Sequence, residues 1–215
     1  MNRRTFLRGT AGASGIVALS GCLDNLSGGD EDSSSPVDLS GGKLDYQGGM
    51  EIGRHAGPNG QIFYADQTAD TVHESAGADG GQENLAWFHT LVHGLFPYHF
   101  ERLGRGWEAD GIYVTDYSRT DWELVEMDNQ PHMPSPTAPE TFADATELTY
   151  VAESNVAGGM GPELFPFSEE SEASMFAQEY NGTLLEFDNI DQSLIESLRN
   201  GSHEMEDDHG GHGDT

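Results

Sequence analysis

Residues 57–64 read GPNGQIFY and residues 161–165 read GPELF, so the chain twice places a Gly-Pro turn directly before a short apolar run. Glycine and proline are the strongest local signals for a turn, and each apolar run that follows fits a short strand. Beyond both turns the pattern predicts a helix and then a further strand. The repeated order predicts an α+β fold made of two small similar units joined by a Pro-rich loop.

The first unit is expected at residues 44–126. It begins with a predicted strand at 61–64, and apolar residues at helical spacing then predict a helix at 83–96. Pro97 should end or kink that helix, because proline cannot donate the helical hydrogen bond. Runs rich in β-branched and aromatic residues predict two further strands, at 111–115 and 122–125.

The second unit is expected at residues 143–200, after a linker at 127–142 whose four prolines argue against regular structure. A strand is predicted at 148–152. Ser168 is a good helix cap, and apolar residues then follow at i, i+3, i+4 and i+7 up to a helix stop at Gly182. A strand and a short terminal helix complete the unit, at 183–187 and 191–199.

The first 22 residues have the parts of an export signal. Adjacent arginines at positions 3 and 4, followed by Phe-Leu, resemble a twin-arginine (Tat) signal, and the apolar stretch is too short to span a bilayer. The segment ends in Leu-Ser-Gly-Cys22, which resembles a lipobox and predicts lipidation of the single cysteine; a buried or free thiol is the alternative. Residues 23–43 are rich in Gly, Ser and Asp and are expected to form a disordered tether.

The charge balance is strongly acidic, with nine Lys and Arg against 38 Asp and Glu and a formal net charge of −29. Such a surface repels nucleic acid and attracts cations. It also fits adaptation to high salt, where screening limits self-repulsion. A single cysteine excludes an internal disulfide and a zinc site built on cysteines.

His89 and His93 are the first candidate metal ligands. On the predicted helix, residues four apart share one face, so the two imidazoles could share an ion, with His99 nearby. Ordinary hydrogen bonds at the edge of the core are the alternative. A zinc protease would need Glu at position 90, where the chain has Thr90.

Met160 lies in Gly158-Gly159-Met160-Gly161-Pro162, where its neighbours have no side chains that could build a core. A thioether placed there suits a soft metal, although it could instead fill a gap in the core. Met50 follows two glycines, with His55 close behind, and gives the same kind of signal.

Residues 201–215 form an acidic tail with three histidines, His203, His209 and His212. Such tails often sequester metal, and a solvated charged tail is the alternative. No nucleophile and base pair, G-x-S-x-G motif or P-loop is present, so no catalytic residue is predicted and the chain is not expected to be an enzyme.

The order of several short motifs resembles the NosL family. They include Gly48-Gly49-Met50, the stretch 57–64, Ile112-Tyr113-Val114-Thr115-Asp116-Tyr117 and Gly159-Met160-Gly161-Pro162. The resemblance implies two related ββαβ-type units in a lipoprotein that binds copper, as Cu(I), and passes it to nitrous oxide reductase. It places the protein, anchored at Cys22, on the outer face of the cytoplasmic membrane, together with the maturation machinery of that exported enzyme. Met50 and Met160 occupy the positions of family methionines.

One departure from the family pattern changes the expected ligands. The family typically has Cys-Gly-Met where this chain has Gly48-Gly49-Met50, and it often has cysteines where this chain has His89 and His93. Histidine in place of thiolate would still bind copper, more weakly and with less preference for Cu(I). The alternative is a divergent surface lipoprotein that has lost the metal and acts as a docking module. A carbon–metal lyase on a similar fold would need a thiolate pair, which the chain lacks.

Overall fold

The computed structural model describes residues 34–71, 82–127 and 129–207, with side chains described up to Gly201, and all of these residues belong to one folded unit that begins at Ser34. The export signal expected at residues 1–22, with Cys22, lies outside the described residues, as do His209 and His212. Among the helices of the described ranges, none is long and apolar enough to cross a membrane.

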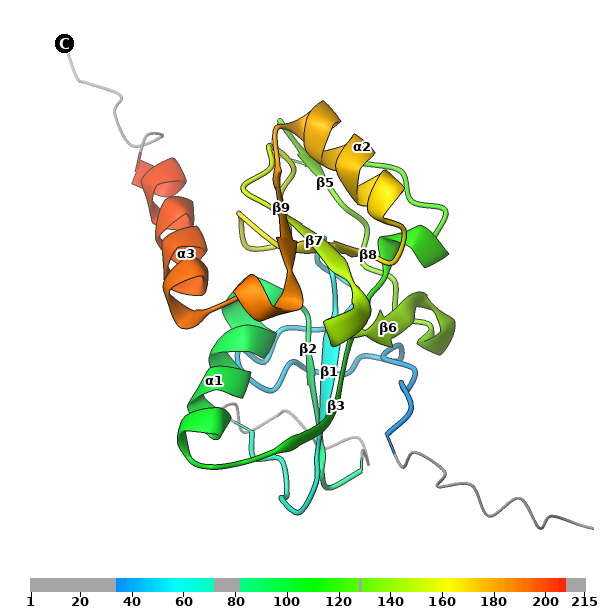
Figure 1. Cartoon of the computed structure of the whole chain (residues 1–215), viewed down its shortest axis with the longest axis vertical. Coiled ribbons are helices and arrows are strands. Elements are labelled where there is room, and N and C mark those ends of the chain that lie inside the picture. Colours follow the sequence, from blue (N-terminus) through cyan, green and yellow to red (C-terminus); the bar gives the residue numbers. More distant parts are fainter. Residues whose placement is uncertain (1–33, 72–81, 128, 208–215) are drawn as a thin grey trace, which may run out of the picture. The chain divides into compact units, whose positions relative to one another are not determined.

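Four antiparallel strands form the larger sheet: β1 (Gly60–Tyr64), β2 (Leu85–Phe88), β3 (Ala109–Thr115) and β6 (Phe142–Asp144). Their order is β2-β1-β3-β6, so β1 and β3 lie at the centre (Figure 1). Every residue of β1 is buried, including the polar Gln61. Strands β1 and β3 confirm the predictions, whereas β6 begins inside the range expected to be an irregular linker.

The predicted helix at 83–96 is wrong in its first half. Leu85–Phe88 forms strand β2, and the helical segment starts only at Leu91, with a π-helical turn (Leu91–Leu95) followed by α1 (Phe96–Gly104). All four residues of β2 are apolar and buried. Periodicity cannot distinguish a buried strand from a buried helix over so short a run.

Thr90 marks the start of the helical segment. Its backbone is extended, and its hydroxyl accepts a hydrogen bond from the N–H of His93 at 3.3 Å, as an N-cap residue does. Pro97 does not end the helix, which was one of the two outcomes predicted for it. It lies in the first turn of α1, where proline is well tolerated.

The second sheet contains β7 (Thr149–Ala152), β8 (Phe165–Phe167) and β9 (Thr183–Glu186) in the order β8-β7-β9, with α2 (Glu170–Tyr180) between β8 and β9 in the chain. The first unit has the same succession of β1, β2, α1 and β3. In both units the first strand lies between the other two. This repetition confirms the α+β fold with two similar ββαβ-type units.

The ends of α2 differ by one residue from the prediction. Glu169, not Ser168, occupies the N-cap position, and the N–H of Ser168 donates to Asp116 Oδ1 at 2.9 Å. Asn181 ends the helix in the left-handed conformation (φ 58°), one residue before the predicted stop at Gly182. Asn is one of the few residues other than glycine that adopt this conformation readily.

The second sheet separates two hydrophobic cores. Tyr150 and Ala152 face a core shared with the first sheet, whereas Val151 faces the core beneath α2, together with Phe165 and Phe167. Alternate residues of a strand point to opposite faces, so β7 contributes to both cores. Burial on both faces explains why this strand is apolar without alternation.

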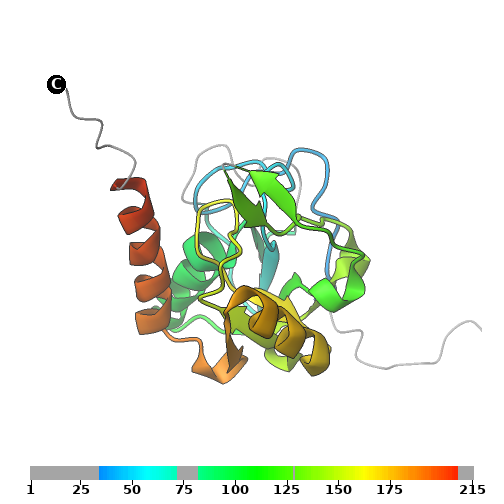
Figure 2. The same cartoon turned by 90° about the horizontal axis from the view of Figure 1, so that it is seen from above.

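The folded unit extends beyond both predicted limits. Leu39 is fully buried, and the main chain of Val37 bonds to the amide of Gln61 in both directions at 2.9 Å. Residues 34–43 therefore belong to the fold, so the expected tether is shorter than 23–43. At the other end, α3 (Gln192–Asp207) continues into residues 201–207, which were assigned to the tail, and it lies beside α1 (Figure 2).

A two-stranded sheet occupies part of the predicted linker. It pairs β4 (Val125–Met127) with β5 (Gln130–His132). The strand predicted at 122–125 is therefore displaced, and only Val125 belongs to it. Pro131 lies within β5, as edge strands permit.

Candidate metal-binding site

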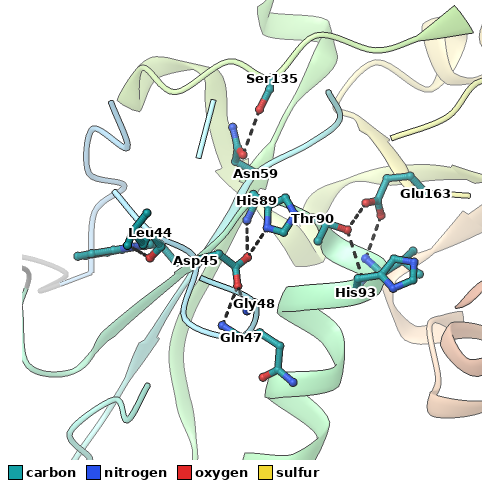
Figure 3. A network of polar contacts seen from close by, with 12 residues as sticks. Leu44, Asp45, Gln47, Gly48, Asn59, His89, Thr90, His93, Ser135 and Glu163 are labelled. Carbon is teal, nitrogen blue, oxygen red and sulfur yellow. Dashed lines mark hydrogen bonds and ion pairs between the residues drawn. The ribbon is translucent and has the colours of Figure 1, made fainter. Parts of the chain in front are cut away.

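His89 lies in a buried polar network that starts where β2 ends (Figure 3). Its Nδ1 is 2.7 Å from Asp45 Oδ2, and its main-chain N–H donates to the same oxygen at 2.8 Å. Its Nε2 is buried and has no hydrogen-bond partner among the described residues. Because an unsatisfied buried nitrogen is costly, Nε2 is a candidate ligand atom.

A second imidazole lies beside His89. The ring centroids of His55 and His89 are 5.9 Å apart, with an interplanar angle of 64°. His55 is partly exposed, whereas His89 is buried. The fold therefore pairs two histidines that are far apart in the sequence.

Each of two loops presents an exposed methionine. Met50 is 37% exposed and Met160 is 43% exposed. The carbonyl of Met50 accepts a hydrogen bond from the N–H of Asp45 at 2.8 Å, so its loop is tied to the residue that contacts His89. Met160 lies in a turn closed by the N–H of Gly158 and the carbonyl of Gly161, which are 2.8 Å apart.

The turn with Met160 packs closely against the segment with His55. A Cβ on Gly159 would lie 2.9 Å from the Cβ of His55, and one on Gly57 would lie 3.0 Å from the Cα of Gly158. A side chain at either glycine would force the two segments apart. Met160 therefore directly follows a residue that is in close contact with His55.

His93 is separated from this pair. Because His89 precedes the helical segment, the two residues do not share a helix face, and the spacing argument for a shared ion is wrong. Figure 3 shows the His89 ring beside Asp45 and His93 on the side of Thr90 that faces Glu163. In the described part of the chain, no group of three or more His, Cys, Asp and Glu side chains could hold a metal. Thioether sulfur from the two exposed methionines would add ligand atoms of another kind.

Glu163 is the second fully buried carboxyl group of this network. It accepts hydrogen bonds from the hydroxyl of Thr90, from the N–H of Val92 at 2.9 Å and from the N–H of Leu164 at 3.0 Å. Burial raises the pKa of Glu163 to about 7, although these hydrogen bonds oppose the shift. The side chain connects the turn that contains Met160 to the start of the helical segment.

The other predicted histidines are not joined to this pair by any described contact. His99 is buried on α1, where burial lowers its pKa to about 4, and its ring lies 6.1 Å from that of Phe100. His203 lies on α3, and its side chain is outside the described part.

The sequence model of the NosL family matches residues 36–195. The chain belongs to the NosL family. The copper-binding lipoprotein NosL of Stutzerimonas stutzeri is 31% identical over 102 residues, which are 47% of each chain, so the match spans about half the length of this relative. The crystal structure of the copper chaperone NosL from Shewanella denitrificans matches with a TM-score of 0.51 at 21% identity, covering 75% of this chain and 98% of that one. The two share the NosL fold.

Sequence interpretation of this NosL-family chain missed the buried carboxyl groups of Asp45 and Glu163. The chain has 38 acidic residues, so no single one stood out. Position offered a signal, since Asp45 precedes the loop of Met50 and Glu163 directly follows the Gly-Pro pair after Met160. His132 was also not considered; its Nδ1 lies 2.8 Å from the carbonyl of Gln130.

Proposed function

We propose that this chain binds a copper ion as cargo, through His89 Nε2 and His55 together with sulfur from Met50 and Met160. The observation that carries the proposal is the buried Nε2 of His89, which has no hydrogen-bond partner among the described residues and lies beside a second imidazole. His93 is the alternative second imidazole.

Ligand chemistry favours copper over harder metals. Thioether selects soft Cu(I), and imidazole suits copper in both oxidation states. The names of the two relatives, a copper-binding lipoprotein and a copper chaperone, point the same way. Because the family thiolates are replaced, binding is expected to be weaker and less selective for Cu(I). Partly exposed methionines would let a bound ion pass to a partner.

The carrier acts outside the cytoplasm in this proposal. The Tat-like signal and the Leu-Ser-Gly-Cys22 motif support export and lipid anchoring on the outer face of the cytoplasmic membrane, and the Stutzerimonas relative is named a lipoprotein. The recipient is an exported copper enzyme, nitrous oxide reductase being expected, with its maturation machinery. The chain itself catalyses no reaction.

A competition titration with Cu(I) tests the proposal. The full chain carrying Cys22→Ser, which removes its single thiol, should bind copper with a stoichiometry of about one. Leucine in place of Met50 and Met160, and glutamine in place of His89, should each weaken binding. Met175→Leu is the matched control, since Met175 is 61% exposed on α2, away from the proposed ligands.

Two further variants separate the alternatives. Weaker binding in His55→Gln but not in His93→Gln would support the pair defined here, and the reverse result would restore His93 as a ligand. A variant with His203, His209 and His212 replaced removes the imidazole ligands of the tail. If this tail variant bound no copper, the metal-free docking module would be the better account.

A further inference from the structure

Asp45 is fully buried and uses both carboxylate oxygens. Oδ1 accepts hydrogen bonds from the N–H groups of Gln47 and Gly48, each at 2.7 Å. Oδ2 accepts the N–H of His89 at 2.8 Å and lies 2.7 Å from its Nδ1 (Figure 3). One side chain therefore contacts both the loop that leads to Met50 and the backbone and ring of His89.

We infer that Asp45 is a positioning residue, which holds His89 in the tautomer with the proton on Nδ1 and fixes the Met50 loop against it. The inference rests on the proposed copper site, because it assigns Nε2 as the ligand atom. Asp45 itself touches no copper.

The contacts of Oδ2 determine where the ring proton lies. An ionised carboxylate only accepts hydrogen bonds, so the His89 nitrogen facing it must donate. A neutral imidazole then has a free lone pair on Nε2. Metal-binding histidines commonly donate their second nitrogen to a carboxylate in this way.

The same residue defines the Met50 loop at both of its ends. The N–H of Asp45 donates to the carbonyl of Met50 at 2.8 Å, and its carbonyl accepts the N–H of Gly49 at 2.9 Å. Gly49 has a φ of 68°, a conformation that favours glycine. Displacing Asp45 would therefore move Met50 and the ring of His89 together.

Long-range ¹H–¹⁵N NMR on the metal-free full chain with Cys22→Ser tests the tautomer without changing Asp45. His89 is assigned by the signal that disappears in His89→Gln. A proton on Nδ1 supports the inference, and a proton on Nε2 or on both nitrogens overturns it.

Cu(I) competition titration of Asp45→Asn tests the consequence for binding. An asparagine amide in place of Oδ2 donates to Nδ1 and should shift the proton to Nε2. The expected result is about a 10- to 100-fold loss of copper affinity together with an NMR shift to the Nε2–H tautomer. The exposed residue Asp121 provides the control Asp121→Asn, which should change neither quantity.

The outcomes distinguish the inference from the proposed function. If the parent chain binds copper and Asp45→Asn binds it equally well, only the role of Asp45 is overturned. If the parent binds no copper, the proposed function fails, and the positioning role for copper fails with it. Should Asp45→Asn not fold, the tautomer measured in the parent still decides.

Discussion

The hydroxyl of Thr90 donates a hydrogen bond to the carboxyl group of Glu163 and so connects the start of the helical segment to the turn that carries Met160. The same carboxyl group accepts the N–H of Val92, one of the donors that a helix start leaves unsatisfied. A side chain of the second unit thus takes part in the N-terminal cap of the helical segment of the first. Because a buried carboxyl group is costly, this arrangement should affect the pH dependence of folding.

The raised pKa of Glu163 predicts that its contribution to stability is lost as the pH rises. Its pKa is about 7 in the folded chain against an ordinary value of 4.5, so between these values the folded chain binds more protons than the unfolded chain. The contribution is fully present below about pH 4.5 and falls by a few kcal/mol by about pH 7. Chemical denaturation at a series of pH values, in high salt to screen the acidic surface, measures this fall.

Glu163→Gln is the control for that prediction. Glutamine does not titrate, so the difference in unfolding free energy between the parent and this variant should shrink or change sign between about pH 4.5 and 7. A difference that stays constant over this range would show that Glu163 titrates normally.

The lowered pKa of His99 predicts that the stability of the fold decreases as the pH falls, which is opposite to the effect of Glu163. Burial lowers the pKa of His99 to about 4 from an ordinary 6.5, so at acidic pH the unfolded chain takes up a proton that the folded chain does not. Stability should fall by up to a few kcal/mol as the pH drops from about 6.5 to 4. His99→Leu removes the titrating group, and its denaturation curves should lack this loss. If parent and variant lose stability equally below pH 6.5, His99 is not the cause.

The two ββαβ-type units were predictable because local signals agree with the final fold in most of their elements. Strands β1, β3 and β7 form where apolar and β-branched residues follow turns. Strand β2 was mistaken for a helix because Leu85–Phe88 is uniformly apolar, and its partner strand, not its own pattern, decides its conformation.

The ligand candidates were only partly predictable for a similar reason. Met50 and Met160 stand out by their glycine neighbours, and His89 was identified through a helix that does not include it. The proximity of His55 to His89 depends on how the loop at 53–57 is placed by the turn at 158–161, a long-range packing effect. Asp45 and Glu163 differ from most other acidic residues in being buried. Burial of a particular carboxyl group cannot be recognised in a sequence with 38 acidic residues.

Gly159→Ala should weaken copper binding and destabilise the fold. A Cβ at this position would lie 2.9 Å from both the Cβ of His55 and the carbonyl oxygen of Ala56, so the two segments must separate. Overpacking of this kind typically costs about 1–3 kcal/mol. Thermal unfolding and Cu(I) titration measure the two effects.

Gly104→Ala is the matched control for that substitution. Nothing lies within 4 Å of a Cβ at Gly104, which ends α1. Alanine there should leave copper binding unchanged and should be neutral or slightly stabilising, since glycine is a poor helix former. An equal loss of copper affinity in both variants would argue against the close approach of the Met160 turn to His55.

Gly48→Cys should strengthen Cu(I) binding, because it places a soft thiol close to Met50, a proposed copper ligand. Gly48 does not adopt the left-handed conformation, and a Cβ there would lie 3.8 Å from the Cγ of Met50 and 3.9 Å from Asp45 Oδ1, which are ordinary contacts. A Cβ is therefore accommodated there in ordinary van der Waals contact. A soft thiolate next to Met50 should raise Cu(I) affinity at least about tenfold, corresponding to about 1.4 kcal/mol.

Cu(I) competition in the Cys22→Ser background measures the change in affinity. The control is Gly48→Ser, which is of similar size but has no sulfur and should bind copper as the parent does. Equal affinities for the cysteine and serine variants would mean that the copper site does not include the Met50 loop.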